Sequence, residues 1–143
     1  MILTNEEQLR IPCSNVEEHE IKDLISQLEI ELNQSELYGN PGVGLAAPQI
    51  GIYKNAAIIR LSKYKINLIN PIITKSIGKF IFEGEGCLSF PGIIEKTNRF
   101  KEIHVQNQIE PKSFIATGLL AVVIVHEIDH LHGILLPDNA IKK

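Results

Sequence analysis

Apolar residues recur at helical spacing in the first quarter of the chain. Those that would share one face of a helix are Ile21, Leu24, Ile25, Leu28 and Leu32. Glu and Gln residues lie between them, as on the solvated face of an amphipathic helix. Ser14 and Glu17 have the spacing of a capping box, and the run Gly-Asn-Pro at 39–41 is a stop signal. We predict an N-terminal amphipathic helix over residues 16–38.

Five later segments have the β-branched residues typical of strands. They read AAIIRL from residue 56, INLINPIIT from 66, GKFIFEGEG from 78, KEIHVQNQ from 101 and SFIAT from 113. The connections between them are too short for the crossover helices that parallel strands require. We therefore expect short strands that are mostly antiparallel. A glycine-rich stretch, PGVGLAAPQIG at residues 41–51, precedes them.

The segment GLLAVVIVHEIDHLHG, residues 118–133, is apolar almost all round in its first half. That pattern is typical of a helix buried on every side. The run VVIV is also compatible with a strand, but the spacing of His126 and His130 and a stop at Gly133 favour a helix. We predict one α+β domain over residues 1–143, in which short, mostly antiparallel strands surround a buried helix that carries HExxH.

Composition and charge exclude several classes of protein. The 143 residues are 44% hydrophobic and 22% charged, which is ordinary for a globular domain, and the net charge is −3. This charge does not indicate a nucleic-acid partner. No apolar run approaches the roughly 18 residues of a membrane span, and the first residues do not resemble a targeting signal. We expect a cytoplasmic protein without a membrane segment, whose Cys13 and Cys87 are separate reduced thiols.

Residues 126–130 read HEIDH, which is an HExxH motif. On a helix, His126 and His130 lie one turn apart on the same face, where both imidazoles can bind one metal ion. Glu127 is close enough to reach a metal-bound water without being a ligand. Asp129 lies on another face and is expected to support a neighbour, and His132 points away. Burying two histidines and an acid without a ligand would be costly.

A third ligand is needed. The longer zinc-protease pattern would place a histidine at position 136, but this residue is Leu136, and only one acid follows the helix. The ligand must therefore lie upstream, where the candidates besides acids are Cys87, Cys13, His104 and His19. A thiolate at Cys87 would complete a Cys-His-His set and leave a fourth position for water. The alternative for either cysteine is a small buried apolar residue, which we favour for Cys13.

Three motifs together resemble the peptide deformylases, which remove the formyl group from the N-terminal formyl-methionine of new proteins. They are GVGLAAPQ at 42–49, EGCLS at 85–89 and HEIDHL at 126–131 followed by Gly133. The first motif alone would be weak, but the three in this order are highly specific. The resemblance spans the chain from the first helix to about residue 137.

The resemblance implies that Cys87, His126 and His130 hold one divalent metal ion. Fe(II) is the usual physiological ion of the family, and zinc, nickel or cobalt can substitute, although the donor types alone would suggest zinc. A metal-bound water would be the nucleophile, and Glu127 would act as general base and then as general acid. Formate and a free N-terminus would result.

The resemblance also assigns the stabilisation of the developing oxyanion to the side-chain amide of Gln49 and the backbone N–H of Leu88. The residues expected to contact the substrate are Val43, Gly44, Gly86, Leu119, Val122 and Val123. The three on the helix lie one and two turns before His126, on its side, and plain core packing is the alternative for them. The glycines of the segment GVG, residues 42–44, would let a substrate backbone approach and pair with this segment as an added strand.

The expected partners are N-formyl-methionyl peptides, that is, nascent chains, with transient proximity to the ribosome. Many family members carry an additional C-terminal helix linked to ribosome docking, whereas here ILLPDNAIKK follows Gly133, so docking by that route is not expected. Two other hypotheses are a hydrolase of another small amide or peptide and a non-catalytic, metal-stabilised binding domain. Glu127 and Gln49 argue against the latter, because neither is needed to hold a metal.

Overall fold

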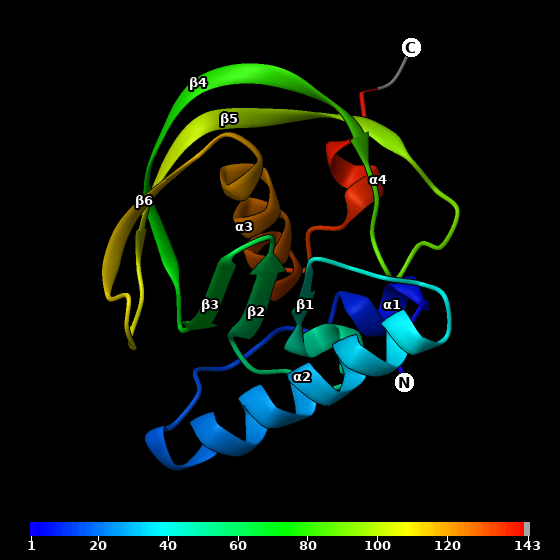
Figure 1. Cartoon of the computed structure of the whole chain (residues 1–143), viewed down its shortest axis with the longest axis vertical. Helices are drawn as coiled ribbons and strands as arrows, with labels where there is room; N and C mark the ends of the chain where they lie inside the picture. The colour runs from blue at the N-terminus through cyan, green and yellow to red at the C-terminus, as the bar shows by residue number, and fades with distance from the viewer. Residues whose placement is uncertain (142–143) are drawn as a thin grey trace.

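Two small antiparallel sheets enclose one helix, and a second helix covers the outer face of one sheet (Figure 1). The computed structural model describes residues 1–141. The first sheet has the order β1 (Gly44–Ala46), β2 (Ala56–Leu61), β3 (Tyr64–Ile69). The second has the order β4 (Ile72–Glu85), β5 (Glu95–Gln106), β6 (Ser113–Thr117). The helices are α1 (Glu6–Leu9), α2 (Ile21–Leu37), α3 (Gly118–Leu131) and α4 (Leu136–Asn139), with 3₁₀ turns η1 (Glu18–Glu20) and η2 (Ala47–Ile50).

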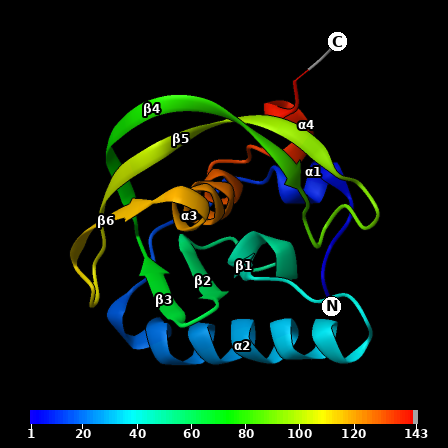
Figure 2. The same cartoon turned by 45° about the horizontal axis from the view of Figure 1, so that its top comes forward.

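The helix α3 lies between the two sheets, and α2 lies on the far side of the first sheet (Figure 2). Strand β2 separates the two hydrophobic cores, because its side chains alternate between its faces. Ala57 and Ile59 belong to the core around α3, whereas Ala56 and Ile58 belong to the core under α2. The predicted α+β class, with antiparallel strands around a buried HExxH helix, is confirmed.

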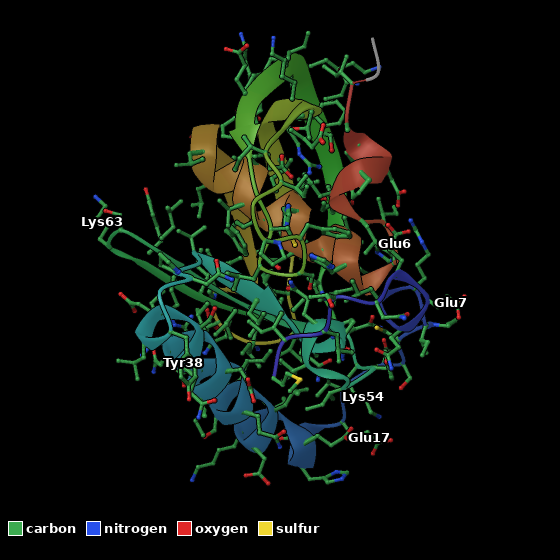
Figure 3. The ribbon with its side chains drawn as sticks, turned by 90° about the vertical axis from the view of Figure 1, so that its right-hand side faces the viewer. Glu6, Glu7, Glu17, Tyr38, Lys54 and Lys63 are labelled. Carbon is green, nitrogen blue, oxygen red and sulfur yellow. The ribbon has the colours of Figure 1, made fainter. Side chains whose placement is uncertain are left out.

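The helix α2 buries the predicted apolar face, including Leu24 and Leu28, but its predicted start is wrong. Regular α-helix begins at Ile21, after the turn η1, rather than at residue 16. The preceding segment is extended because its backbone has distant partners: the N–H of Val16 donates to the Asn70 side chain at 2.8 Å, and Ser14 pairs with residues 53–55. Figure 3 shows the labelled side chains near the two ends of this region, Glu17 and Tyr38, on the outer surface.

The strands form in the predicted places with different boundaries. The predicted strand from residue 66 is divided, because Asn70 has a positive φ of 48° and Pro71 follows it, so β3 ends and β4 begins there. The predicted strand from residue 78 is the second half of the long β4, which pairs with β5. The glycine-rich stretch supplies a short strand, β1, that the sequence did not predict.

The C-terminal end of α3 is fixed to both ends of the chain. Gly133 has a φ of +72° and follows the helix as its stop residue. The Arg10 guanidinium donates to the Gly133 carbonyl at 2.8 Å and binds the Asp138 carboxylate. Ala140 then forms a β-bridge with Thr97 of β5.

Over residues 1–141, none of the helices is long and apolar enough to cross a membrane.

The tight contact at Gly133 predicts a larger loss of stability there than at the equivalent end of α2. Alanine at Gly133 would adopt a left-handed φ and place its Cβ 3.3 Å from the Arg10 carbonyl oxygen, whereas Gly39, with a φ of +82°, has open space. We expect Gly39→Ala to cost about 1 kcal/mol and Gly133→Ala about 2 kcal/mol or more, measured by urea unfolding. Equal losses would contradict the role assigned to the Arg10 contact.

Candidate metal centre

The two histidines of the HExxH motif lie side by side in the core. One turn of α3 separates them, and their ring centroids are 5.1 Å apart. His126 is 9% exposed and His130 is 1% exposed. The flanking predictions for this helix hold as well: His132 is exposed, and Asp129 binds a basic side chain, accepting a hydrogen bond from Arg99 at 3.1 Å.

Cys87 meets these histidines from a distant part of the chain. It follows β4 in a turn in which the Phe90 N–H donates to the Cys87 carbonyl at 3.0 Å. Its Sγ lies 3.4 Å from His130 Nε2. One atom from each of Cys87, His126 and His130 lies within 4.8 Å of the others, and over residues 1–141 no other group of three His, Cys, Asp or Glu side chains could hold a metal ion in this way. Cys13, His19 and His104 take no part.

The donor set fits a divalent metal ion. Burial, with a smaller contribution from His126, lowers the pKa of His130 to about 3, so its imidazole is neutral and can offer a lone pair. Two imidazoles and a thiol are donors that zinc, iron and nickel accept. Cys13, in contrast, is half-buried and is not part of this donor group. Burial raises the pKa of its thiol to about 11. Both thiols are free, as predicted.

Glu85 holds His126 from behind. Its carboxylate lies 2.7 Å from His126 Nδ1, and it accepts further hydrogen bonds from Thr97 Oγ1 at 2.8 Å and from Nε and Nη2 of Arg99. Burial raises the pKa of Glu85, but the hydrogen bonds from His126 and Arg99 outweigh it and lower this pKa to about 2. The carboxylate is therefore ionised and accepts from the Nδ1–H of His126, so Nε2 is the nitrogen of this ring that a metal could use. Burial lowers the pKa of His126, but hydrogen bonds to Cys87 and Glu85 outweigh it and raise this pKa, so Nε2 must release its proton when an ion binds.

Glu127 is buried in the wall of the site. Burial raises the pKa of its carboxyl group to about 7, and its Oε1 has no hydrogen-bond partner among the described residues. The other oxygen lies against Gly44, where an added Cβ would be only 2.7 Å from Oε2. Glycine at this position of β1 therefore leaves room for the Glu127 carboxylate. A carboxyl group with a pKa near neutrality suits proton transfer.

Gln49 and Leu88 are both neighbours of Cys87. The Gln49 carboxamide oxygen accepts from the Ala46 N–H at 2.9 Å, which turns Nε2 toward the cysteine. Nε2 donates to Ser89 Oγ at 3.1 Å and lies 3.6 Å from Cys87 Sγ. Leu88 follows Cys87 in the chain and is almost fully buried. Both residues thus sit within the same small region as the candidate ligands.

A cavity of about 410 Å³ opens beside His126 and Glu127. The residues expected to contact substrate all line it: Val43, Gly44, Gly86, Leu119, Val122 and Val123. Val122 and Val123 are buried in its wall, whereas Val43 and Leu119 are 42% and 50% exposed at its mouth. Most of the lining is apolar, as in pockets that bind a small hydrophobic side chain.

Sequence reasoning missed part of the support of this site. From the sequence, Glu85 and Ser89 were recognised only as members of the EGCLS motif, with no role assigned, and Arg99 was not identified as part of the site. Thr97 and Arg99 do carry a signal, because two polar residues at alternate positions of a strand face the same side. Their partners lie on other elements, however, and nothing local indicates those contacts.

Taken with the fold, the arrangement defines the class of protein: a hydrolase that works with a metal ion.

Known proteins of one family resemble this chain over its full length. The family model described as polypeptide deformylase matches residues 1–143. A peptide deformylase of Hydrogenovibrio crunogenus is 40% identical over 145 residues, covering 97% of this chain and 83% of that protein. The crystal structure of the Thermotoga maritima peptide deformylase matches with a TM-score of 0.86 and 31% identity over 99% of this chain and 97% of that one. The crystal structure of a peptide deformylase from Synechococcus elongatus in complex with actinonin matches with a TM-score of 0.84 and 34% identity, over 100% of this chain and 79% of that one.

The chain belongs to the peptide deformylase family. It is therefore a metal-dependent hydrolase that removes the formyl group from the N-terminal formyl-methionine of newly made proteins, as the resemblance of its three motifs implied.

Burial of Glu127 predicts a pH-dependent stability in chelator-treated protein. Its pKa rises from the ordinary value of 4.5 to about 7 on folding, so the folded chain binds this proton more tightly than the unfolded chain. The unfolding free energy must then fall as the pH rises through this window, by about 3 kcal/mol. Glu127→Gln removes the effect, so its stability relative to wild type should grow by that amount between pH 4.5 and pH 8 in urea unfolding. A constant difference would contradict the burial argument.

Proposed function

We propose that deformylation in this chain uses one divalent metal ion held by Cys87, His126 and His130, with Glu127 as the group that carries the proton. The observation that carries this proposal is the convergence of the three donor atoms within 4.8 Å, beside the buried Glu127 carboxyl group. The donors come from two segments some forty residues apart in the sequence. A group of purely structural residues would have no need of the adjacent, unpaired carboxyl group.

Fe(II) is the ion we propose as physiological, with zinc, nickel or cobalt as substitutes. A thiolate and two imidazoles can bind each of these four ions. When bound, the ion supplies Lewis-acid polarisation and makes water acidic enough to lose a proton near neutral pH. Glu85 contributes by holding the Nδ1–H of His126, which keeps the ring in one orientation and in the tautomer that a ligand needs.

Glu127 takes the proton from the attacking water and returns it to the amine nitrogen as the C–N bond breaks. The products are formate and a free N-terminus. Burial places the Glu127 pKa near 7 in the free chain, where a carboxyl group can both accept and release a proton. A nearby cation lowers this pKa and so favours the basic form at the start of the reaction.

Gln49 and Leu88 stabilise the negative charge that develops on the formyl oxygen. The side-chain amide of Gln49 is already oriented, because its oxygen accepts from Ala46 and its nitrogen donates toward Ser89 and Cys87. The backbone N–H of Leu88 is the second donor. Preorganised donors of this kind are each worth about 3 kcal/mol in other enzymes.

The methionine side chain of the substrate occupies the apolar cavity between α3 and the loop that contains Val43. Val122 and Val123 form its wall, and Gly44 and Gly86 let the peptide backbone approach the site. The substrates are N-formyl-methionyl nascent chains, which the chain meets transiently near the ribosome. A cytoplasmic location follows from these substrates. The whole chain forms one catalytic domain; residues 142–143 of the predicted 1–143 lie outside the described residues.

Replacing Glu127 should separate metal binding from turnover. Glu127→Ala is expected to keep the metal, because Glu127 is not one of its ligands, and to lose at least about 100-fold in kcat, because proton transfer then has no carrier. The measurement is formate release from a formyl-Met peptide by protein prepared anaerobically with Fe(II), with metal content determined on the same samples. Absence of formate from the wild type, or an undiminished rate in the variant, would sink the mechanism.

Replacing Glu85 should weaken metal binding through His126. Glu85→Gln removes the charge that orients this ring, and we expect an affinity loss of about 10- to 100-fold in competition with a chromogenic chelator. Glu83→Gln is the matched control, since Glu83 lies two residues away on the same strand with an exposed side chain. Thr97→Val, which removes a single donor to Glu85, is a milder variant if Glu85→Gln does not fold. Equal affinities in the Glu85 and Glu83 variants would argue against the orienting role.

A further inference from the structure

Four branched apolar side chains stand at the mouth of the cavity. Ile93 and Ile94 are 44% and 67% exposed, and the same cavity is lined by Val43 from the loop before β1 and by Leu119 from α3. Single exposed apolar residues are ordinary on protein surfaces. A group of them around one cavity mouth is a different observation, because such a patch marks a binding surface when it is continuous with a site.

The backbone holds Ile93 and Ile94 in place without substrate. Two successive turns lead from Cys87 to them: the Phe90 N–H donates to the Cys87 carbonyl, and the Ile93 N–H donates to the Phe90 carbonyl at 3.1 Å. The Ile94 side chain lies over Gly86, with its Cδ1 3.3 Å from the place that a Cβ on Gly86 would occupy. The pair is therefore fixed next to the segment that carries the candidate ligand Cys87, and little ordering is needed on binding.

The cavity mouth offers no ionic partner. Among the described residues that line the cavity there is no lysine or arginine. The two acids in the lining, Glu85 and Glu127, are 5% and 4% exposed and belong to its buried end. A charged substrate side chain placed against Ile93 and Ile94 would lose water contacts without gaining a partner, whereas an apolar one would gain buried area.

The substrate side chain that meets this surface follows from extended-chain geometry. In an extended peptide, alternate side chains point to the same side and lie about 7 Å apart. If the methionine side chain enters the cavity, the second residue points away and the third returns to the side of the mouth. We propose that Ile93 and Ile94 bind the third residue of the nascent chain and select apolar side chains there. This inference rests on the proposed function.

The test uses the full chain loaded with nickel and the peptides formyl-Met-Ala-Xaa, where Xaa is Leu, Ser, Asp or Lys. Formate release gives kcat and KM for each peptide. We expect kcat/KM for Leu to exceed that for Asp by about tenfold, as for a partly buried apolar contact, and the difference to lie in KM, because the contact is the same before and during the reaction.

Two substitutions at Ile94 test the assignment. Ile94→Thr should lower the Leu-to-Asp ratio to about twofold by removing apolar area, and Ile94→Arg should invert it by adding a partner for Asp. Ile115→Thr is the matched control: Ile115 is 58% exposed, lies in β6 and does not line the cavity, so the ratio should stay as in the wild type.

Failure of this inference differs from failure of the proposed function. Formate from all four peptides at equal kcat/KM would overturn the Ile93 and Ile94 assignment alone. A preference that appears only when the second residue is varied, in formyl-Met-Xaa-Ser peptides, would overturn it as well. Formate from none of the peptides would overturn the proposed function itself.

Discussion

The need to compensate buried charge organises this molecule. Glu85 is the centre of that compensation, because its ionised carboxylate accepts from Thr97, Arg99 and His126 on two other elements, and Arg99 in turn binds Asp129. A buried charge that lost one of these partners would be strongly destabilising. The network therefore ties β4 and β5 to α3 and keeps the imidazole of His126 directed at Cys87. Under the proposed mechanism, stability and catalysis depend on the same contacts.

Much of the fold could be predicted from the sequence where a local pattern has one structural solution. The apolar spacing of α2 and the β-branched runs of β2 and β6 are such patterns. The start of α2 could not be predicted, because the Val16 N–H donates a hydrogen bond to the side chain of Asn70, more than fifty residues away. Nor could β1, because Gly-Leu-Ala carries no β-branched residue and is a strand only through its pairing with β2.

The residues of the candidate site also divide into those that a local sequence pattern predicts and those that depend on tertiary packing. His126, Glu127 and His130 are spaced by the helix itself, so the sequence alone predicts their common location. Cys87 was one of several upstream candidates on residue types, and the resemblance of three motifs selected it. The partners of Glu85 could not be inferred, because two strands and a helix have to pack before Arg99 and His126 meet it. Contacts that depend on tertiary packing leave no local pattern.

The double-sided burial of β2 has a consequence for how the molecule comes apart. Its alternate side chains belong to the core under α2 on one face and to the core around α3 on the other. Neither core is closed without this strand, so the loss of one exposes a wall of the other. The chain should then melt as a single cooperative unit, in which disturbance of the outer helix α2 reaches the candidate metal centre through β2.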